Sequence, residues 1–134
     1  MMSLNPFPAL NDPQVLTDVT VMSDRYEKAL GENILHELDV LFYDGAETVR
    51  YGVGENLYGF EEIQAFRRAR TGGSPPREVL RRVITAVGQD VATVDLEFRR
   101  IGAEKIGRQS QTWFRTPDGW KIIAAHVSLM GAGS

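Results

Sequence analysis

Arg50 lies in the middle of a short segment that otherwise has the composition of a β-strand. Residues 47–51 read ETVRY, and glycines follow at positions 52, 54 and 59. A planar guanidinium can donate parallel N–H bonds to both oxygens of a carboxylate. In a partly dry pocket, such a contact would fix the orientation of an anionic ligand. The alternative is an arginine that faces water or pairs with a protein carboxylate, as most charged side chains do.

Tyr26 is a second side chain whose position suits chemistry. It belongs to an apolar series with steps of three and four, formed with Val15, Val19, Met22 and Leu30. Either it is an ordinary core tyrosine whose hydroxyl reaches water, or its phenol donates a hydrogen bond or a proton near Arg50.

The last apolar segment and the polar stretch before it offer further candidates. His126 lies among apolar neighbours and alternates with Ser128. It is either a hydrogen-bonded core histidine or, with Ser128, part of the floor of a pocket, where it would contact the ligand or move a proton. Within the polar stretch 109–112, one alternating pair must face inward or toward a partner. We prefer Gln111 as a ligand contact because it would share a face with Trp113.

Glu55 and Arg68 are weaker candidates for substrate binding. Glu55 follows two glycines, so its alternative role is that of a solvated turn residue. Arg68 falls in the last turn of an expected helix, where a positive charge complements the helix dipole. Neither position requires a ligand.

Composition restricts the class of protein. At 134 residues and 43% hydrophobic, the chain suits one domain, with residues 1–11 as an N-terminal arm. A net charge of -3 disfavours nucleic acid as a partner. The arm is broken by prolines and makes a poor signal peptide, and no apolar run is long enough to span a membrane. We therefore expect a soluble cytoplasmic protein.

Several well-defined binding and catalytic motifs are not found in this sequence. The glycines after Arg50 do not fit the dinucleotide-binding pattern, because Leu57 occupies the third glycine position. His36 and His126 are far apart and the chain has no cysteine, so we expect no metal site. Neither a phosphate-binding loop nor a serine nucleophile motif is present.

Three helices are expected before a sheet. Asp12 and Pro13 begin the first helix, which ends at Gly31. Asn33 would cap a short second helix, and a third follows Gly59. Four strands then occupy residues 81–87, 91–100, 106–116 and 120–129. This order predicts the α+β class, with helices covering one face of a curved antiparallel sheet.

The last strand is apolar on both faces. We expect Ile122 and Ala124 on one side, and the other side is formed by Ile123, Ala125, Val127 and Leu129. Because neither face is clearly the solvated one, we expect a homodimer through the sheet face.

Three separated blocks resemble one known family. LFYDGAETVRYGVGENLYG at 41–59, GRQSQTWFR at 107–115 and GWKIIAAHVS at 119–128 are similar to the AtzH-like group, which includes the HpxZ-type oxalurate catabolism proteins. That group is part of the SnoaL-like, or nuclear-transport-factor-two-like, superfamily. The resemblance covers nearly everything from Pro13 to Leu129. It implies a cone-shaped, cystatin-like fold that encloses a pocket.

The resemblance also implies catabolism of ureides and carboxylated ureas. AtzH-type members convert 1,3-dicarboxyurea to allophanate, whereas related ketosteroid isomerases pair a tyrosine with an aspartate base. Here Arg50 stands at a similar offset from Tyr26 in place of that base. Because arginine stays charged, the replacement disfavours steroid isomerisation and favours a small anionic carboxylate or ureide substrate. An N-carboxylate breaks down readily once its nitrogen is protonated, so Tyr26 as proton donor beside Arg50 would suffice for decarboxylation without a cofactor. Hydrolysis of the carboxylated urea is the other reaction that the resemblance leaves open. Alternatives are a non-catalytic binding or accessory protein for an amidohydrolase pathway, and an isomerase or dehydratase that acts on an apolar ligand.

Overall fold

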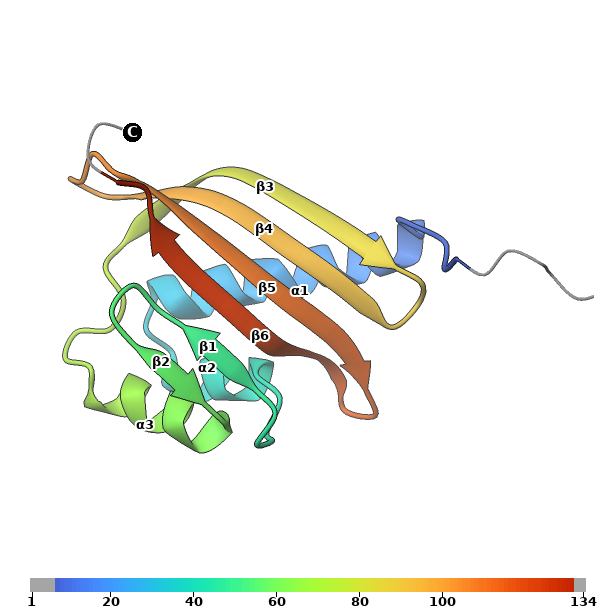
Figure 1. Ribbon diagram of the computed structural model, residues 1–134, viewed down its shortest axis with the longest axis horizontal. Helices are drawn as coiled ribbons and strands as arrows, with labels where there is room; N and C mark the ends of the chain where they lie inside the picture. Colours follow the sequence, from blue (N-terminus) through green and yellow to red (C-terminus); the bar gives the residue numbers. More distant parts are fainter. Residues whose placement is uncertain (1–6, 132–134) are drawn as a thin grey trace, which may run out of the picture.

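The computed structural model describes residues 7–131, which form three helices and six strands. Figure 1 shows their arrangement. In chain order the elements are α1 (Pro13–Gly31), α2 (Leu35–Leu41), β1 (Val49–Tyr51), β2 (Asn56–Tyr58), α3 (Phe60–Ala69), β3 (Arg77–Val87), β4 (Val91–Arg100), β5 (Ile106–Thr116) and β6 (Gly119–Leu129). Helices followed by a sheet confirm the predicted α+β class. Residues 1–6 of the expected arm lie outside the described residues.

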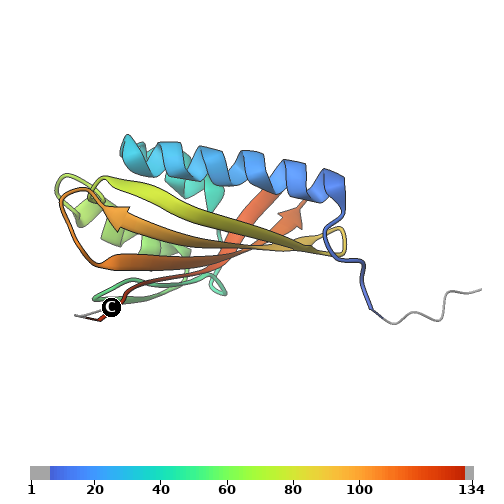
Figure 2. The same cartoon turned by 90° about the horizontal axis from the view of Figure 1, so that it is seen from above.

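The strands form one curved sheet in the order β2-β1-β6-β5-β4-β3. Strands β3 to β6 make a long antiparallel meander, and β1 joins it by a parallel pairing with β6. Figure 2 shows α1 lying across one face of the sheet, whereas no helix of residues 7–131 covers the opposite face. We call that opposite face, formed by β3 to β6, the outer face.

Local sequence explains where α1 begins and how the chain leaves it. The Asp12 carboxylate accepts hydrogen bonds from the N–H groups of Gln14 and Val15 at 3.0 and 3.2 Å, as expected of an N-cap. At the other end, the N–H of Asn33 donates to the Leu30 carbonyl. Asn33 has a φ of 53°, which asparagine tolerates better than most residues.

Several local predictions differ from the structure, and β3 begins at Arg77 instead of the predicted Arg81. Asn33 does not cap α2, because its left-handed conformation turns the chain out of α1, and Ile34 occupies the N-cap position instead. Strand β2 was not predicted, since it is only three residues long and follows a glycine-containing turn. It pairs back onto β1 and places Arg50 opposite Leu57.

A β-bulge interrupts β6 beside β5. Trp113 pairs with Ile122, but Thr112 pairs with Ala124, so Ile123 is an extra residue on β6. A bulge adds one position to the two-residue alternation of a strand. The predicted alternation across this segment is therefore wrong: Ile122 shares the helix-covered face with Ala125 instead of Ala124.

The core lies between the helices and the inner face of the sheet. Its largest fully buried side chains include Leu41, Phe42, Ile63, Trp113 and Ile122. These residues fill the middle of the molecule. The end of the cone where α1 and α3 finish is left partly hollow.

Candidate functional site

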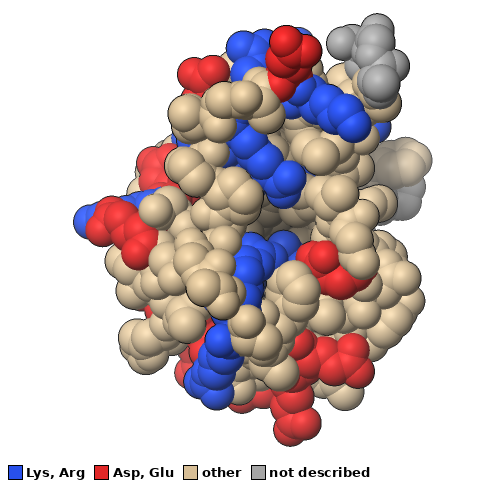
Figure 3. Space-filling model, turned by 90° about the vertical axis from the view of Figure 1, so that its left-hand side faces the viewer, with Lys and Arg blue, Asp and Glu red and all other residues tan. Residues whose placement is uncertain are grey.

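A cavity of about 220 Å³ occupies that hollow end. In Figure 3 the hollow has basic side chains on opposite sides and an acidic side chain at its edge. The lining residues come from both ends of the chain: Tyr26, Leu30, Arg50, Val53, Glu55, Phe66, Arg70, Ser74, Pro75, Arg77, Phe98, Arg100, Gln109 and Val127. A smaller cavity of about 20 Å³ adjoins it and shares Tyr26, Arg50 and Arg70.

Arg50 lines both cavities from the short strand β1. Pairing of β1 with β6 sets Arg50 beside Ala125 on the helix-covered face of the sheet. Its side chain is 12% exposed, and its Nη1 donates to Glu55 Oε1 at 3.0 Å. Glu55 reaches this position because the β1–β2 turn folds back over the cavity. Arg50 therefore both faces the cavity and pairs with a protein carboxylate.

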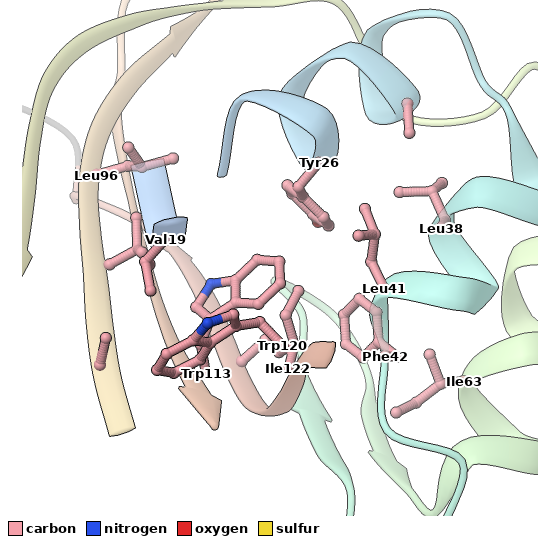
Figure 4. Close-up of a cluster of buried hydrophobic side chains, with 14 of the residues drawn as sticks. Val19, Tyr26, Leu38, Leu41, Phe42, Ile63, Leu96, Trp113, Trp120 and Ile122 are labelled. Carbon is pink, nitrogen blue, oxygen red and sulfur yellow. The ribbon is translucent and has the colours of Figure 1, made fainter. Parts of the chain in front are cut away.

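Tyr26 projects from α1 into the same space and is 3% exposed. Figure 4 shows its ring beside the Leu41 side chain, and the centre of the Phe42 ring lies 6.3 Å from that of Tyr26. Its hydroxyl oxygen accepts a hydrogen bond from Gln109 Nε2 at 3.4 Å. Because the oxygen acts as the acceptor here, the hydroxyl hydrogen can be donated to a ligand.

Three further arginines line the cavity and were not predicted as site residues. Arg77 donates two hydrogen bonds to Glu27, at 3.2 and 2.7 Å, and so is neutralised. Among residues 7–131, neither Arg70 nor Arg100 forms an ion pair with a carboxylate. The register of the β3–β4 hairpin, which sets Arg77 opposite Arg100, is the signal that could have found two of these arginines.

Burial and neighbouring charge both perturb the pKa of Arg70. Burial, followed by repulsion from Arg50, lowers the pKa of Arg70, while Glu55 and Tyr26 oppose the shift. The Arg70 guanidinium lies 4.7 Å from the centre of the Phe66 ring. A bound anion would relieve the repulsion among these guanidinium groups.

Arg67 forms the inner wall of the smaller cavity. It is 8% exposed, and its Nη1 donates to Asp39 Oδ1 at 3.3 Å. Its guanidinium also lies 4.3 Å from the centre of the Phe42 ring. Burial is the main cause of its lowered pKa, and Arg50 adds to the effect, whereas Tyr26 and Asp39 oppose it.

The AtzH-like family model matches residues 8–133. This chain belongs to the AtzH-like family. A comparison with curated proteins found no match.

Solved structures support the same fold for this AtzH-like protein. A Pectobacterium atrosepticum protein of unknown function is 54% identical, with a TM-score of 0.88, and the match covers 91% of this chain and 95% of that one. A Burkholderia xenovorans protein described as cystatin-like is 43% identical, with a TM-score of 0.88 and coverage of 92% and 98%. A nuclear transport factor 2-like protein from Salmonella enterica is 21% identical, with a TM-score of 0.73 and coverage of 90% and 94%; it is similar in fold.

Some residues predicted for the site of this AtzH-like protein lie outside the cavity. The bulge at Ile123 turns His126 and Ser128 toward the outer face, where the His126 ring lies 5.6 Å from that of Tyr51. The expectation that they floor the pocket is therefore wrong. Arg68 is 63% exposed and pairs with Asp39 at 3.6 Å, so it does not line the cavity either.

Gln111 faces inward as predicted but does not reach the cavity. It is buried in the core, where its Oε1 accepts a hydrogen bond from Trp113 Nε1 at 3.1 Å. Gln109, two residues earlier on the same face, takes the position beside Tyr26. The two-residue alternation of the strand predicted correctly that Gln111 faces inward. It could not predict how far along the strand the cavity lies.

Two kinds of feature are absent from the described part of the chain. Within residues 7–131, no cluster of three or more His, Cys, Asp or Glu side chains could hold a metal ion. None of the described helices is both long and apolar enough to cross a membrane.

Proposed function

We propose that this AtzH-like protein binds a carboxylated urea or related ureide and removes CO₂ from it, with Arg50 as anion anchor and Tyr26 as proton donor. The main support is the charge of the cavity. Arg70 and Arg100 lack carboxylate partners among the described residues, in a protein whose overall net charge is -3. Such a local excess of positive charge attracts a small anion. The narrower HpxZ-type assignment stays a prediction.

Arg50 can bind a ligand without releasing Glu55. Glu55 accepts from Nη1 only, and a guanidinium carries five N–H donors. The remaining donors of Arg50 can hold a ligand carboxylate, while Arg70 and Arg100 would neutralise a second one. A dianion such as 1,3-dicarboxyurea would therefore place one carboxylate on Arg50 and the other between Arg70 and Arg100.

The chemical step needs one proton. Tyr26 donates its hydroxyl hydrogen to the nitrogen that carries the carboxylate. The N–C bond then breaks, its electron pair stays on nitrogen, and the carboxylate leaves as CO₂. For 1,3-dicarboxyurea the product is allophanate, and solvent returns a proton to Tyr26. Arginine contacts that hold the leaving group in place lower the barrier by orientation and electrostatic stabilisation.

Carbon-13 NMR of freshly generated 1,3-dicarboxyurea with the purified protein tests this proposal. The native protein should accelerate formation of allophanate and CO₂ over buffer. Arg50→Met and Tyr26→Phe should each reduce the acceleration by about a hundredfold. Arg68→Met and Tyr58→Phe are matched controls, since both side chains are more than half exposed and outside the cavity. Binding without acceleration would favour the non-catalytic alternative, and equal rates in Arg50→Met would refute its role as anchor.

We also propose that a second copy of the chain covers the outer face. Val83, Val87 and Val91 are each more than a third exposed, and no helix of the described residues covers this side. The same face presents charges of both signs, with Arg81 opposite Glu97 and Glu97 opposite Arg108 in neighbouring strands. A face with apolar residues and both charges can complement itself across a two-fold axis.

A further inference from the structure

Two buried polar atoms near Tyr26 lack partners among the described residues. Arg67 Nη2 and Gln109 Oε1 are both fully enclosed and form no hydrogen bond within residues 7–131. The two side chains are 8% and 2% exposed. Leaving such groups unpaired is costly, so buried polar atoms nearly always have a partner. A ligand that supplied both partners would recover that cost.

Both side chains border the cavities, and a neighbouring side chain holds each of them in place. Gln109 lines the larger cavity and donates its amide N–H to Tyr26. Arg67 lines the smaller one, where Asp39 and the Phe42 ring fix its guanidinium. These supports use Arg67 Nη1 and Gln109 Nε2, and they leave Arg67 Nη2 and Gln109 Oε1 without a partner among the described residues.

One of the two unpaired atoms is a hydrogen-bond donor and the other is an acceptor. Arg67 Nη2 can only donate a hydrogen bond, and Gln109 Oε1 can only accept one. A ligand group that offers an oxygen acceptor and an N–H donor within a few bonds satisfies both. Amides and ureas have this pattern, whereas simple carboxylic acids and ketones lack the N–H.

We propose that Arg67 and Gln109 form an inner subsite that recognises the –CO–NH– group of the ligand, with Arg67 donating to its oxygen and Gln109 accepting from its N–H. This subsite rests on the proposed function and explains how a ureide would be preferred over other small carboxylates. Arg50 and Arg70 attract any anion. The ligand N–H distinguishes a ureide from other small carboxylates, because a ligand without this group leaves Gln109 Oε1 unpaired.

Isothermal titration calorimetry with two stable probes tests the subsite. N-carbamoylglycine carries a urea group and a carboxylate, and levulinate replaces both urea nitrogens by carbon while keeping the carbonyl, the carboxylate and the charge. The native protein should bind N-carbamoylglycine about tenfold more tightly, as expected for one hydrogen bond. Gln109→Met should bring the ratio of the two Kd values close to one.

Arg67→Lys tests the donor while keeping a positive charge beside Asp39. It should weaken binding of both probes by about tenfold, because both offer a carbonyl oxygen. Arg68→Lys is the matched control on the same helix, since Arg68 pairs with the same carboxylate from the surface. Gln111→Met is the matched control for Gln109, being a buried glutamine on the same strand face outside the cavities. Circular dichroism checks that each variant is folded.

Several outcomes would overturn the subsite. Equal affinity of the native protein for the two probes would show that the N–H of the ligand is not recognised. If the native protein bound neither probe, the subsite would also be refuted. An unchanged preference in folded Gln109→Met, or native affinities in folded Arg67→Lys, would remove that residue from the subsite. Turnover of 1,3-dicarboxyurea is measured separately by NMR, so failure of the subsite is distinct from failure of the proposed reaction.

Discussion

The arginine cluster combines two opposing effects at the level of single residues. Arg50, Arg70 and Arg100 all border a partly buried cavity, where like charges repel one another more strongly than in water. Glu55 compensates Arg50 directly, whereas Arg70 forms no ion pair within residues 7–131 and has its contact to Phe66 and weaker attraction from Glu55 and Tyr26. The proposed anion site would thus be maintained at some expense in stability, as is common at functional sites.

Arg70→Met should therefore change stability and binding in opposite directions. Because burial and repulsion from Arg50 both lower the pKa of Arg70, removing the charge should raise Tm, while affinity for N-carbamoylglycine falls by about tenfold. Thermal melts and calorimetry on the same preparation measure both effects. A lower Tm would show that contact with Phe66 outweighs the repulsion, and unchanged affinity would exclude Arg70 as an anion contact.

His126→Ala should leave the decarboxylation rate unchanged. The bulge at Ile123 directs His126 to the outer face, away from Tyr26 and Gln109. The carbon-13 NMR assay on native and variant protein provides the measurement. Loss of activity in a folded, correctly assembled His126→Ala variant would contradict the placement of this side chain outside the cavity.

Secondary-structure elements position the cavity through a few local features. The hairpin of β1 and β2 brings Glu55 to Arg50, and the bulge in β6 restores an apolar inner face beyond Ile123. Gly107 on β5 matters because a Cβ at this position would collide with the Phe98 ring. Phe98 in turn lines the cavity and stacks against Arg77, with the guanidinium 4.5 Å from the ring centre.

Gly107→Ala should affect both folding and binding. The added methyl must displace the Phe98 ring, which is 1% exposed and therefore has little room to move. We expect a loss of about 1 to 3 kcal/mol in the free energy of unfolding, and weaker ligand binding because Phe98 shifts toward the cavity. Urea denaturation and calorimetry measure these effects, and Gly54→Ala, where a Cβ meets nothing within 4 Å, is the control. Native stability in Gly107→Ala would contradict the steric argument.

The N-cap of α1 predicts a dependence of stability on pH. A hydrogen bond from Gln89, followed by one from the Val15 N–H, holds the pKa of Asp12 below its ordinary value of 3.8. A carboxylate with a lowered pKa stabilises the fold above its unfolded pKa of about 3.9, and the contribution is lost as the pH falls through the folded pKa.

Asp12→Ala should accordingly lower Tm at neutral pH, and the difference from the native protein should shrink below about pH 4. Thermal melts across this range give the result. Glu104→Ala removes an exposed loop carboxylate and serves as the control. An equal loss of Tm at all pH values would show that the charge of Asp12 does not contribute.

At the level of the whole molecule, the two faces of the sheet have different roles. The inner face, covered by α1, builds the core and cavity, whereas the outer face is not covered by any helix of residues 7–131 (Figure 2). Closing the outer face against a second copy would bury its valines without blocking the cavity, whose lining residues lie on the helix side. Assembly and ligand binding can therefore be tested separately.

Val83→Asp should convert a dimer into a monomer in sedimentation velocity experiments. Val83 is 43% exposed on the outer face, opposite Asp95 in the neighbouring strand. A carboxylate introduced at this position would face another carboxylate and would be buried without a partner in the interface. Val21→Asp, at a 53% exposed position on α1, should leave the assembly unchanged. A native protein that sediments as a monomer would refute the proposed interface.

Sequence alone determined the features that depend on local rules. The cap at Asp12, the end of α1 near Gly31, and the hairpin meander follow from helix and turn preferences together with a period of two. The chemical types of Arg50 and Tyr26 also indicated an anion and a proton donor. Both side chains do line the cavity.

Tertiary structure decided which polar residues share the cavity, because that depends on register and depth. One extra residue at Ile123 moved His126 and Ser128 to the outer face, a change that alternation cannot anticipate. Arg70, Arg100 and Gln109 come together from three separate elements, so no spacing in the chain records their proximity. Within residues 7–131, Arg67 Nη2 and Gln109 Oε1 have no hydrogen-bond partner. Only the tertiary structure shows this, because the partners of a buried polar atom come from residues far apart in the chain.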